Sequence, residues 1–71
     1  MIYLRYFASL REMLGRSTDE LELLKNDTVF DVWKLANPDI PLPENTLTAV
    51  NMDYVLRSHL VEDGDEVAFF P

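Results

Sequence analysis

The stretch that decides the fold is IYLRYFASLREMLG, residues 2–15. Its first half alternates between two faces, and this period of two predicts a β-strand over residues 2–8. The inward face is predicted to carry Ile2, Leu4, Tyr6 and Ala8, and the outward face Tyr3, Arg5 and Phe7.

A short helix over residues 10–14 is predicted directly after this strand. Ser9 and Glu12 have the Ser-x-x-Glu spacing of a capping box, in which each side chain meets the other residue's free N–H. Gly15 follows the last apolar residue, where a left-handed C-cap favours glycine. The chain therefore begins with a strand and a helix in immediate succession.

Two further elements come before the middle of the chain. Residues 18–24 alternate again and predict a second strand, antiparallel to the first because the connection is short. Thr28 can cap a longer helix, with Asp31 in its first turn, and Pro38 ends that helix at or before Asn37. Its apolar face is predicted to consist of Val29, Val32, Trp33 and Ala36.

The second half of the chain contains an irregular loop and three strands. Residues 37–46 hold three prolines and predict the loop. The strands are predicted over residues 47–51, 54–57 and 66–70, separated by turns at 51–53 and 63–65. This order predicts an α+β domain, with one main helix across one face of a mixed sheet.

The first and last strands are apolar on both faces, which favours central places in the sheet. If they are parallel neighbours, Phe7 and Phe70 lie at the same end of the sheet. Both phenylalanines also point away from the predicted core. A contiguous apolar patch of this kind, with Tyr54 beside it and Arg5 and Arg11 as a charged rim, indicates a partner-binding surface. The alternatives are that the assignment of faces is wrong or that a loop covers the two rings.

Composition sets the remaining limits. The 71 residues are enough for one domain, residues 1–71, and the eight aromatic side chains can build a core. No apolar run approaches the roughly 20 residues that cross a bilayer, and the absence of cysteine fits a reducing cytoplasm. The formal charge of −7 argues against nucleic acid and favours a basic surface on another protein.

Two sequence features invite a chemical function, and we reject both. Ser58 and His59 are adjacent on a segment expected to be extended, so their side chains project to opposite faces and cannot readily form a nucleophile–base pair. The acidic run at residues 62–66 lacks the carboxylate spacing of a calcium loop and is interpreted as a reverse turn around Gly64. We therefore predict no catalytic residue, no metal and no cofactor within this chain.

At this point the sequence resembles a known family, MoaD, the small sulfur-carrier subunit of molybdopterin synthase. The resemblance covers nearly the whole chain and rests on four quoted motifs. They are YFASLREMLG at residues 6–15, Thr28-Val29, Ala49-Val50-Asn51, and DGDEVAFFP at residues 63–71. The resemblance implies a ubiquitin-like β-grasp fold, a five-stranded mixed sheet with one main and one short helix.

The resemblance also implies a function and partners. In this family an E1-like enzyme of the MoeB type adenylates the C-terminal Gly-Gly, which is then converted to a thiocarboxylate. The tail gives its sulfur to a cyclic pyranopterin phosphate in the large subunit, MoaE, in an expected assembly of two small and two large subunits. Aromatic positions on the family's partner-binding surface match Phe7 and Phe70, with Tyr54 at a position that is usually apolar.

The sequence departs from the family at its end. It stops at Pro71, and no glycine follows Gly64. The family's short tail ending in Gly-Gly is expected to follow Pro71. Its absence from the sequence is explained most simply by disorder, which is common in terminal tails. The alternatives are a shortened chain and a divergent member without carrier function. Two other functions stay open: a ubiquitin-like interaction module that binds through Phe7, Tyr54 and Phe70, and a sulfur carrier of the thiamine pathway, the ThiS type.

Overall fold

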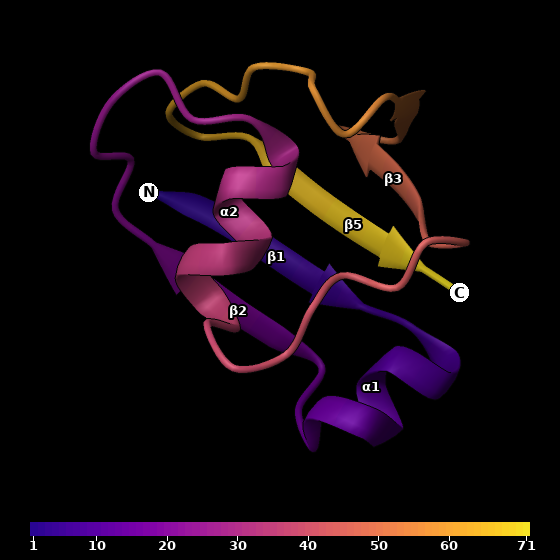
Figure 1. Ribbon diagram of the computed structural model, residues 1–71. Coiled ribbons are helices and arrows are strands. Elements are labelled where there is room, and N and C mark those ends of the chain that lie inside the picture. The colour runs from indigo at the N-terminus through magenta and orange to yellow at the C-terminus, as the bar shows by residue number, and fades with distance from the viewer.

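The computed structural model describes residues 1–71 as one sheet covered on one face by a helix (Figure 1). Its seven elements are β1 (Ile2–Tyr6), α1 (Ala8–Leu14), β2 (Thr18–Leu21), α2 (Val29–Ala36), β3 (Leu47–Val50), β4 (Asp53–Val55) and β5 (Glu66–Phe70). The order of elements agrees with the order predicted from the sequence. The predicted α+β class with a mixed sheet is confirmed.

The sheet has the order β2-β1-β5-β3-β4, and every neighbouring pair is antiparallel except β1 and β5. Those two strands are parallel, with Leu4 beside Val67 and Tyr6 beside Phe69. The prediction that the two ends of the chain pair at the centre of the sheet is confirmed. Strands with neighbours on both sides carry apolar residues at most positions, whereas the edge strand β2 reads Thr-Asp-Glu-Leu.

Helix α2 provides the other half of the core. Thr28 and Asp31 form a reciprocal capping box at its start, and the helix ends at Ala36 with Asn37 as its C-cap. Trp33 is fully buried, its ring packs edge-on against Tyr6 and Phe69, and its indole N–H donates to the Ile40 carbonyl at 2.7 Å. The predicted apolar face of this helix is confirmed.

One polar cluster closes the bottom of the core. The Tyr6 hydroxyl donates to the Asp19 carboxylate at 2.8 Å and accepts from the Asn37 amide at 3.2 Å. Arg16 also pairs with Asp19 and donates to the carbonyl of Ala36 at the end of α2. These bonds join β1, β2 and α2, and they satisfy a phenol that would otherwise be buried without partners.

Helix α1 corrects two predictions. It begins at Ala8 instead of residue 10, and its N-cap is Phe7 with no side-chain cap. Ser9 lies inside the helix, so the capping box with Glu12 is wrong. The chain reverses at Ala8, whose φ is +50°, and Ala8 is exposed rather than part of the inward face. Gly15, with φ of +73°, is the predicted left-handed C-cap.

Four strands are shorter than predicted. β1 ends at Tyr6 instead of residue 8, and β3 ends at Val50 instead of residue 51. β2 ends at Leu21 instead of residue 24, and β4 spans Asp53–Val55 instead of residues 54–57. β4 ends early because the segment after it bonds to α2: the Arg57 carbonyl accepts the Phe30 N–H, and the His59 carbonyl accepts the Val29 N–H. The chain after Val55 leaves the sheet because it supplies acceptors to the first turn of α2.

We predict that Trp33→Ala lowers the free energy of unfolding by about 3–5 kcal/mol, because it empties the centre of the core and removes a buried hydrogen bond. Phe30→Ala on the exposed side of the same helix is the control and should cost about 1 kcal/mol or less. Urea denaturation measures both. A loss below about 0.5 kcal/mol for Trp33→Ala would show that the indole is not part of the core.

The Tyr6 phenol predicts a specific alkaline transition. Burial raises the pKa of Tyr6 from 10.0 to about 12, and the nearby Asp19 carboxylate adds to the rise. The folded state disfavours the phenolate, so the neutral phenol contributes to the free energy of unfolding. This contribution is complete below pH 10 and is lost as the pH rises towards 12. At 1.36 kcal/mol per pKa unit the loss is about 2–3 kcal/mol.

The measurement is the free energy of unfolding at pH 9 to 12, compared between the wild type and Tyr6→Phe. The phenylalanine variant loses the two hydrogen bonds of the hydroxyl and is less stable at neutral pH. Its stability should nevertheless fall less steeply across this range. Parallel curves for the two proteins would contradict the assignment of the transition to Tyr6.

Candidate functional site

The outer face of the sheet, opposite α2, carries an aromatic patch of Phe7, Tyr54 and Phe70. Phe7 and Phe70 stack with ring centroids 4.6 Å apart and planes 6° from parallel. The ladder between β1 and β5 positions them, because the Phe7 N–H donates to the Phe69 carbonyl at 3.2 Å. Phe69 therefore points into the core while its neighbour Phe70 points outward.

Tyr54 on β4 extends the patch along the face. Its ring lies 6.2 Å from Phe70, and 73% of the residue is exposed. Leu47 adds a side chain that sequence reasoning missed: it is paired with Phe70 in the β3–β5 register and is half exposed. No local signal in the sequence places Leu47 in the patch, because its contact with Phe70 depends on β3 being the strand beside β5.

The charged rim is only partly as predicted. The Arg5 guanidinium lies 5.2 Å from the centroid of the Phe7 ring and 3.9 Å from the Glu66 carboxylate. Arg11 is exposed on α1, but its side chain forms no hydrogen bond, ion pair or ring contact with the patch. The structure thus brings Phe7, Tyr54 and Phe70 together with Arg5 and leaves Arg11 to one side.

The end of the chain lies next to the patch. Pro71 follows Phe70 directly, and it lines a shallow cavity of about 370 Å³ together with Ser9 and Met13 of α1. The C-terminus in Figure 1 extends from the end of β5, beside the loop that precedes β3. Any surface that covers Phe70 therefore also meets the C-terminal end of the chain.

The structure places the two rejected motifs, Ser58-His59 and the acidic turn at residues 62–66, on the surface. Ser58 and His59 are exposed and form no hydrogen bond with each other. In the acidic turn, Asp65 accepts the Glu62 N–H at 2.8 Å and the Asn51 amide at 2.9 Å, while Asp63 pairs with the N-terminal amine. That ion pair lowers the pKa of Asp63. No cluster of three or more histidine or carboxylate side chains is arranged to hold a metal ion.

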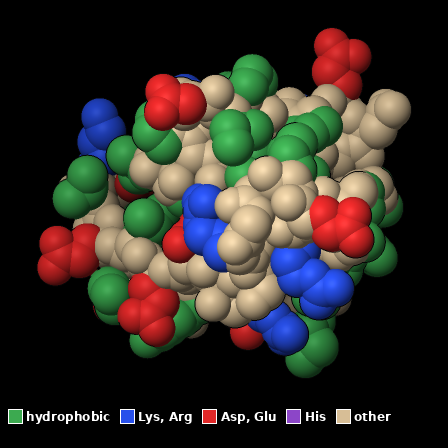
Figure 2. Space-filling view, turned by 90° about the horizontal axis from the view of Figure 1, so that it is seen from below, with side chains coloured by type: hydrophobic (Ala, Val, Ile, Leu, Met, Phe, Trp, Pro, Cys, Tyr) green, Lys and Arg blue, Asp and Glu red, His purple; other side chains and the backbone are tan.

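Side chains of both charges lie on the surface, but acidic ones predominate in the chain. The face in Figure 2, seen from below the view in Figure 1, carries acidic and basic side chains side by side. The chain as a whole has a formal charge of −7. No helix in the structure combines the length and the apolar character required to cross a membrane. The aromatic patch is therefore an apolar area on an acidic domain.

Comparison with known proteins agrees with this architecture. Small archaeal modifier protein 1, SAMP1, from Haloferax volcanii superposes with a TM-score of 0.84 over 99% of this chain and 92% of its own, at 22% identity. At that identity the likeness shows the fold alone, which is the ubiquitin-like β-grasp. A putative molybdopterin converting factor, subunit 1, from Pyrococcus furiosus gives a TM-score of 0.77 at 27% identity, covering 99% and 94% of the two chains.

Sequence comparison identifies the family. The ThiS family model matches residues 4–71. A molybdopterin synthase sulfur carrier subunit from Escherichia coli (strain K12) is 39% identical over 80 residues, covering all of this chain and 94% of that protein. The chain therefore belongs to the ThiS family and, within it, groups with the molybdopterin synthase sulfur carrier subunit, MoaD.

Proposed function

We propose that this protein is the sulfur-carrier subunit of a molybdopterin synthase. The observation that carries the proposal is the 39% identity to the Escherichia coli carrier subunit along the entire chain. The structure supports it in a second way. The domain has an exposed aromatic patch beside its C-terminal end, where a subunit that delivers a group to another protein's active site would meet that protein.

The proposed chemistry takes place on a Gly-Gly tail that continues from Pro71. A free carboxylate is unreactive, so an activating enzyme of the MoeB type first forms an acyl-adenylate at the terminal glycine. Sulfide-level sulfur from a donor then displaces AMP and leaves a thiocarboxylate. Each transfer of sulfur to the cyclic pyranopterin phosphate returns the tail to a carboxylate, so the two sulfurs of one dithiolene use two loaded tails. Glycines suit this tail because they lack Cβ atoms and can pass through a narrow channel.

The partner of the aromatic patch is proposed to be the large catalytic subunit. Phe7, Tyr54 and Phe70 form its apolar centre, Arg5 lies at its margin, and Arg11 would meet the partner from α1, to one side of the patch. In this proposal the large subunit is of the MoaE type, in a heterotetramer of two small and two large subunits, and the same face binds the activating enzyme in the cytoplasm. The charge of −7 would speed the encounter with basic partners.

A thiamine-pathway carrier is the second candidate, because the family model that matches the chain is that of ThiS. The two functions differ in their acceptor protein. A reconstituted mixture of the tailed gene product, its activating enzyme, ATP and a sulfur source should convert cyclic pyranopterin phosphate to molybdopterin only when the large synthase subunit is added. Sulfur transfer to a thiazole synthase instead, with no molybdopterin formed, would establish the second function.

The patch makes its own prediction. Phe70→Asp should weaken binding of the large subunit at least about 100-fold, because it places a charge at the centre of a desolvated aromatic contact. Phe30→Asp, the same substitution on the opposite face, should leave the affinity within about twofold. Calorimetric titration measures both, and thermal melts verify that each variant is folded. Unchanged affinity in a folded Phe70→Asp protein would show that the patch is not the interface.

A further inference from the structure

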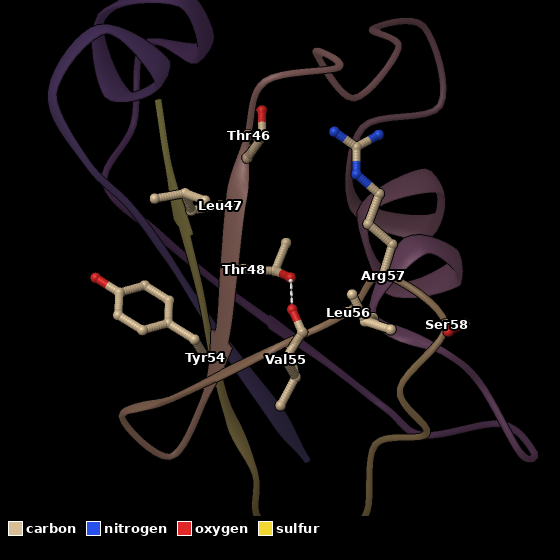
Figure 3. A pocket seen from close by; sticks show the side chains of 8 residues that line it. All are labelled: Thr46, Leu47, Thr48, Tyr54, Val55, Leu56, Arg57 and Ser58. Carbon is tan, nitrogen blue, oxygen red and sulfur yellow. Dashed lines mark hydrogen bonds between the residues drawn. The ribbon is translucent and has the colours of Figure 1, made fainter.

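A groove of about 620 Å³ opens at the edge of the sheet where β4 separates from β3 (Figure 3). Thr48 is the first residue of β3 with a partner on β4, and its hydroxyl donates to the Val55 carbonyl at 2.7 Å. Thr46 and Leu47 precede that pair and have no strand beside them on the β4 side. They form one wall of the groove, and residues 56–58 form the other.

Fixed contacts hold this groove open. The Arg57 carbonyl accepts the Phe30 N–H at 3.1 Å, which ties the far wall to the first turn of α2. The Arg57 guanidinium donates to the carbonyls of Pro43 and Glu44, which ties the same wall to the loop before β3. The separation of the two walls is therefore part of the folded structure and not the fraying of an edge strand.

The lining of the groove combines exposed apolar side chains with polar groups. Leu56 is 79% exposed, and Tyr54 and Leu47 are also exposed at the groove. The Thr46 residue is only 8% exposed, yet its hydroxyl has no hydrogen-bond partner. Arg57 has no carboxylate within ion-pair distance although the chain has a charge of −7. Apolar side chains and a guanidinium without a carboxylate partner lie within one groove.

The groove is continuous with the aromatic patch. Leu47 is paired with Phe70 across the β3–β5 ladder, and Tyr54 contacts Phe70 and also lines the groove. Figure 3 shows Tyr54 and Leu47 on one side of β3 and Arg57 on the other, so the groove passes around the edge of the sheet. A protein seated on Phe7 and Phe70 would reach the groove without leaving the surface.

We infer that an extended segment of the large synthase subunit lies in this groove, between the start of β3 and residues 56–58. Its apolar side chains pack against Leu47 and Leu56, and a carboxylate of the segment pairs with Arg57. The inference rests on the proposed function, since it extends the footprint of the same partner. A second copy of this chain fits less well, because two chains of charge −7 repel each other.

Leu56 provides the decisive variant, because it is highly exposed and lies outside the aromatic patch. In calorimetric titration with the large subunit, Leu56→Asp should weaken binding at least about tenfold. Leu24→Asp is the matched control, since Leu24 is 69% exposed and lies after β2, outside the groove. It should remain within about twofold of wild type. Equal affinities for the two variants would overturn the inference.

Arg57→Gln tests the carboxylate, with Lys25→Gln as a control that removes the same charge elsewhere. Only Arg57→Gln should weaken the complex, by about fivefold or more. Amide hydrogen exchange at residues 43–46 of the free variant verifies that the loop is still held. In the wild-type complex, exchange at residues 56–58 should slow because the segment covers this wall of the groove, and exchange as fast as in the free chain would show that the groove is not occupied.

The outcomes separate this inference from the function on which it rests. If Phe70→Asp abolishes binding and Leu56→Asp does not, the large subunit binds the aromatic patch alone and the groove inference is wrong. If the wild-type protein with its tail does not bind the large subunit at all, the proposed function fails together with the inference.

Discussion

The parallel pairing of β1 with β5 is the constraint on which the rest of the structure depends. It brings the two ends of the chain to the centre of one sheet, and its register determines which side chains enter the core. Tyr6 and Phe69 face inward, stack on each other and pack edge-on against Trp33. Since side chains alternate along a strand, the same register sends Phe7 and Phe70 to the opposite face at the end of the chain.

A shift of this register by one residue would therefore change stability and function together. It would expose Phe69 and bury Phe70, because the side-chain period of a strand is two. The proposed binding face does not require a dedicated loop or a bound ion. It is the outer surface of the same two strands whose inner surface packs in the core. A domain of 71 residues has few elements, so one strand pair provides both surfaces.

Much of this fold was predictable from local patterns. Alternation located the strands, Thr28 and Asp31 located the start of α2, and apolar residues on both faces identified the central pair. The proximity of Phe7 and Phe70 followed from that pairing. The boundaries that were wrong depend on distant contacts. Ser9 does not cap α1 because the chain already turns at Phe7, which is held by the Phe69 carbonyl.

The candidate site shows the same division. β4 ends early because the segment after it satisfies the N-terminus of α2, a contact between residues nearly thirty positions apart that no local pattern encodes. The groove beside Leu56 exists for that reason, and Leu47 joins the aromatic patch because β3 lies next to β5. The direction in which Arg11 points depends on where α1 begins. The sequence pattern predicted that start at residue 10, whereas the helix begins at Ala8.

The measurement that tests the central claim most directly is the intact mass of the native gene product, co-expressed with its own activating enzyme. The account predicts a chain that extends past Pro71 to a terminal Gly-Gly and that carries one sulfur in place of one oxygen. A chain whose mass shows no such tail and no such exchange would contradict the carrier function. It would leave a β-grasp domain that binds a partner through Phe7 and Phe70 without delivering sulfur.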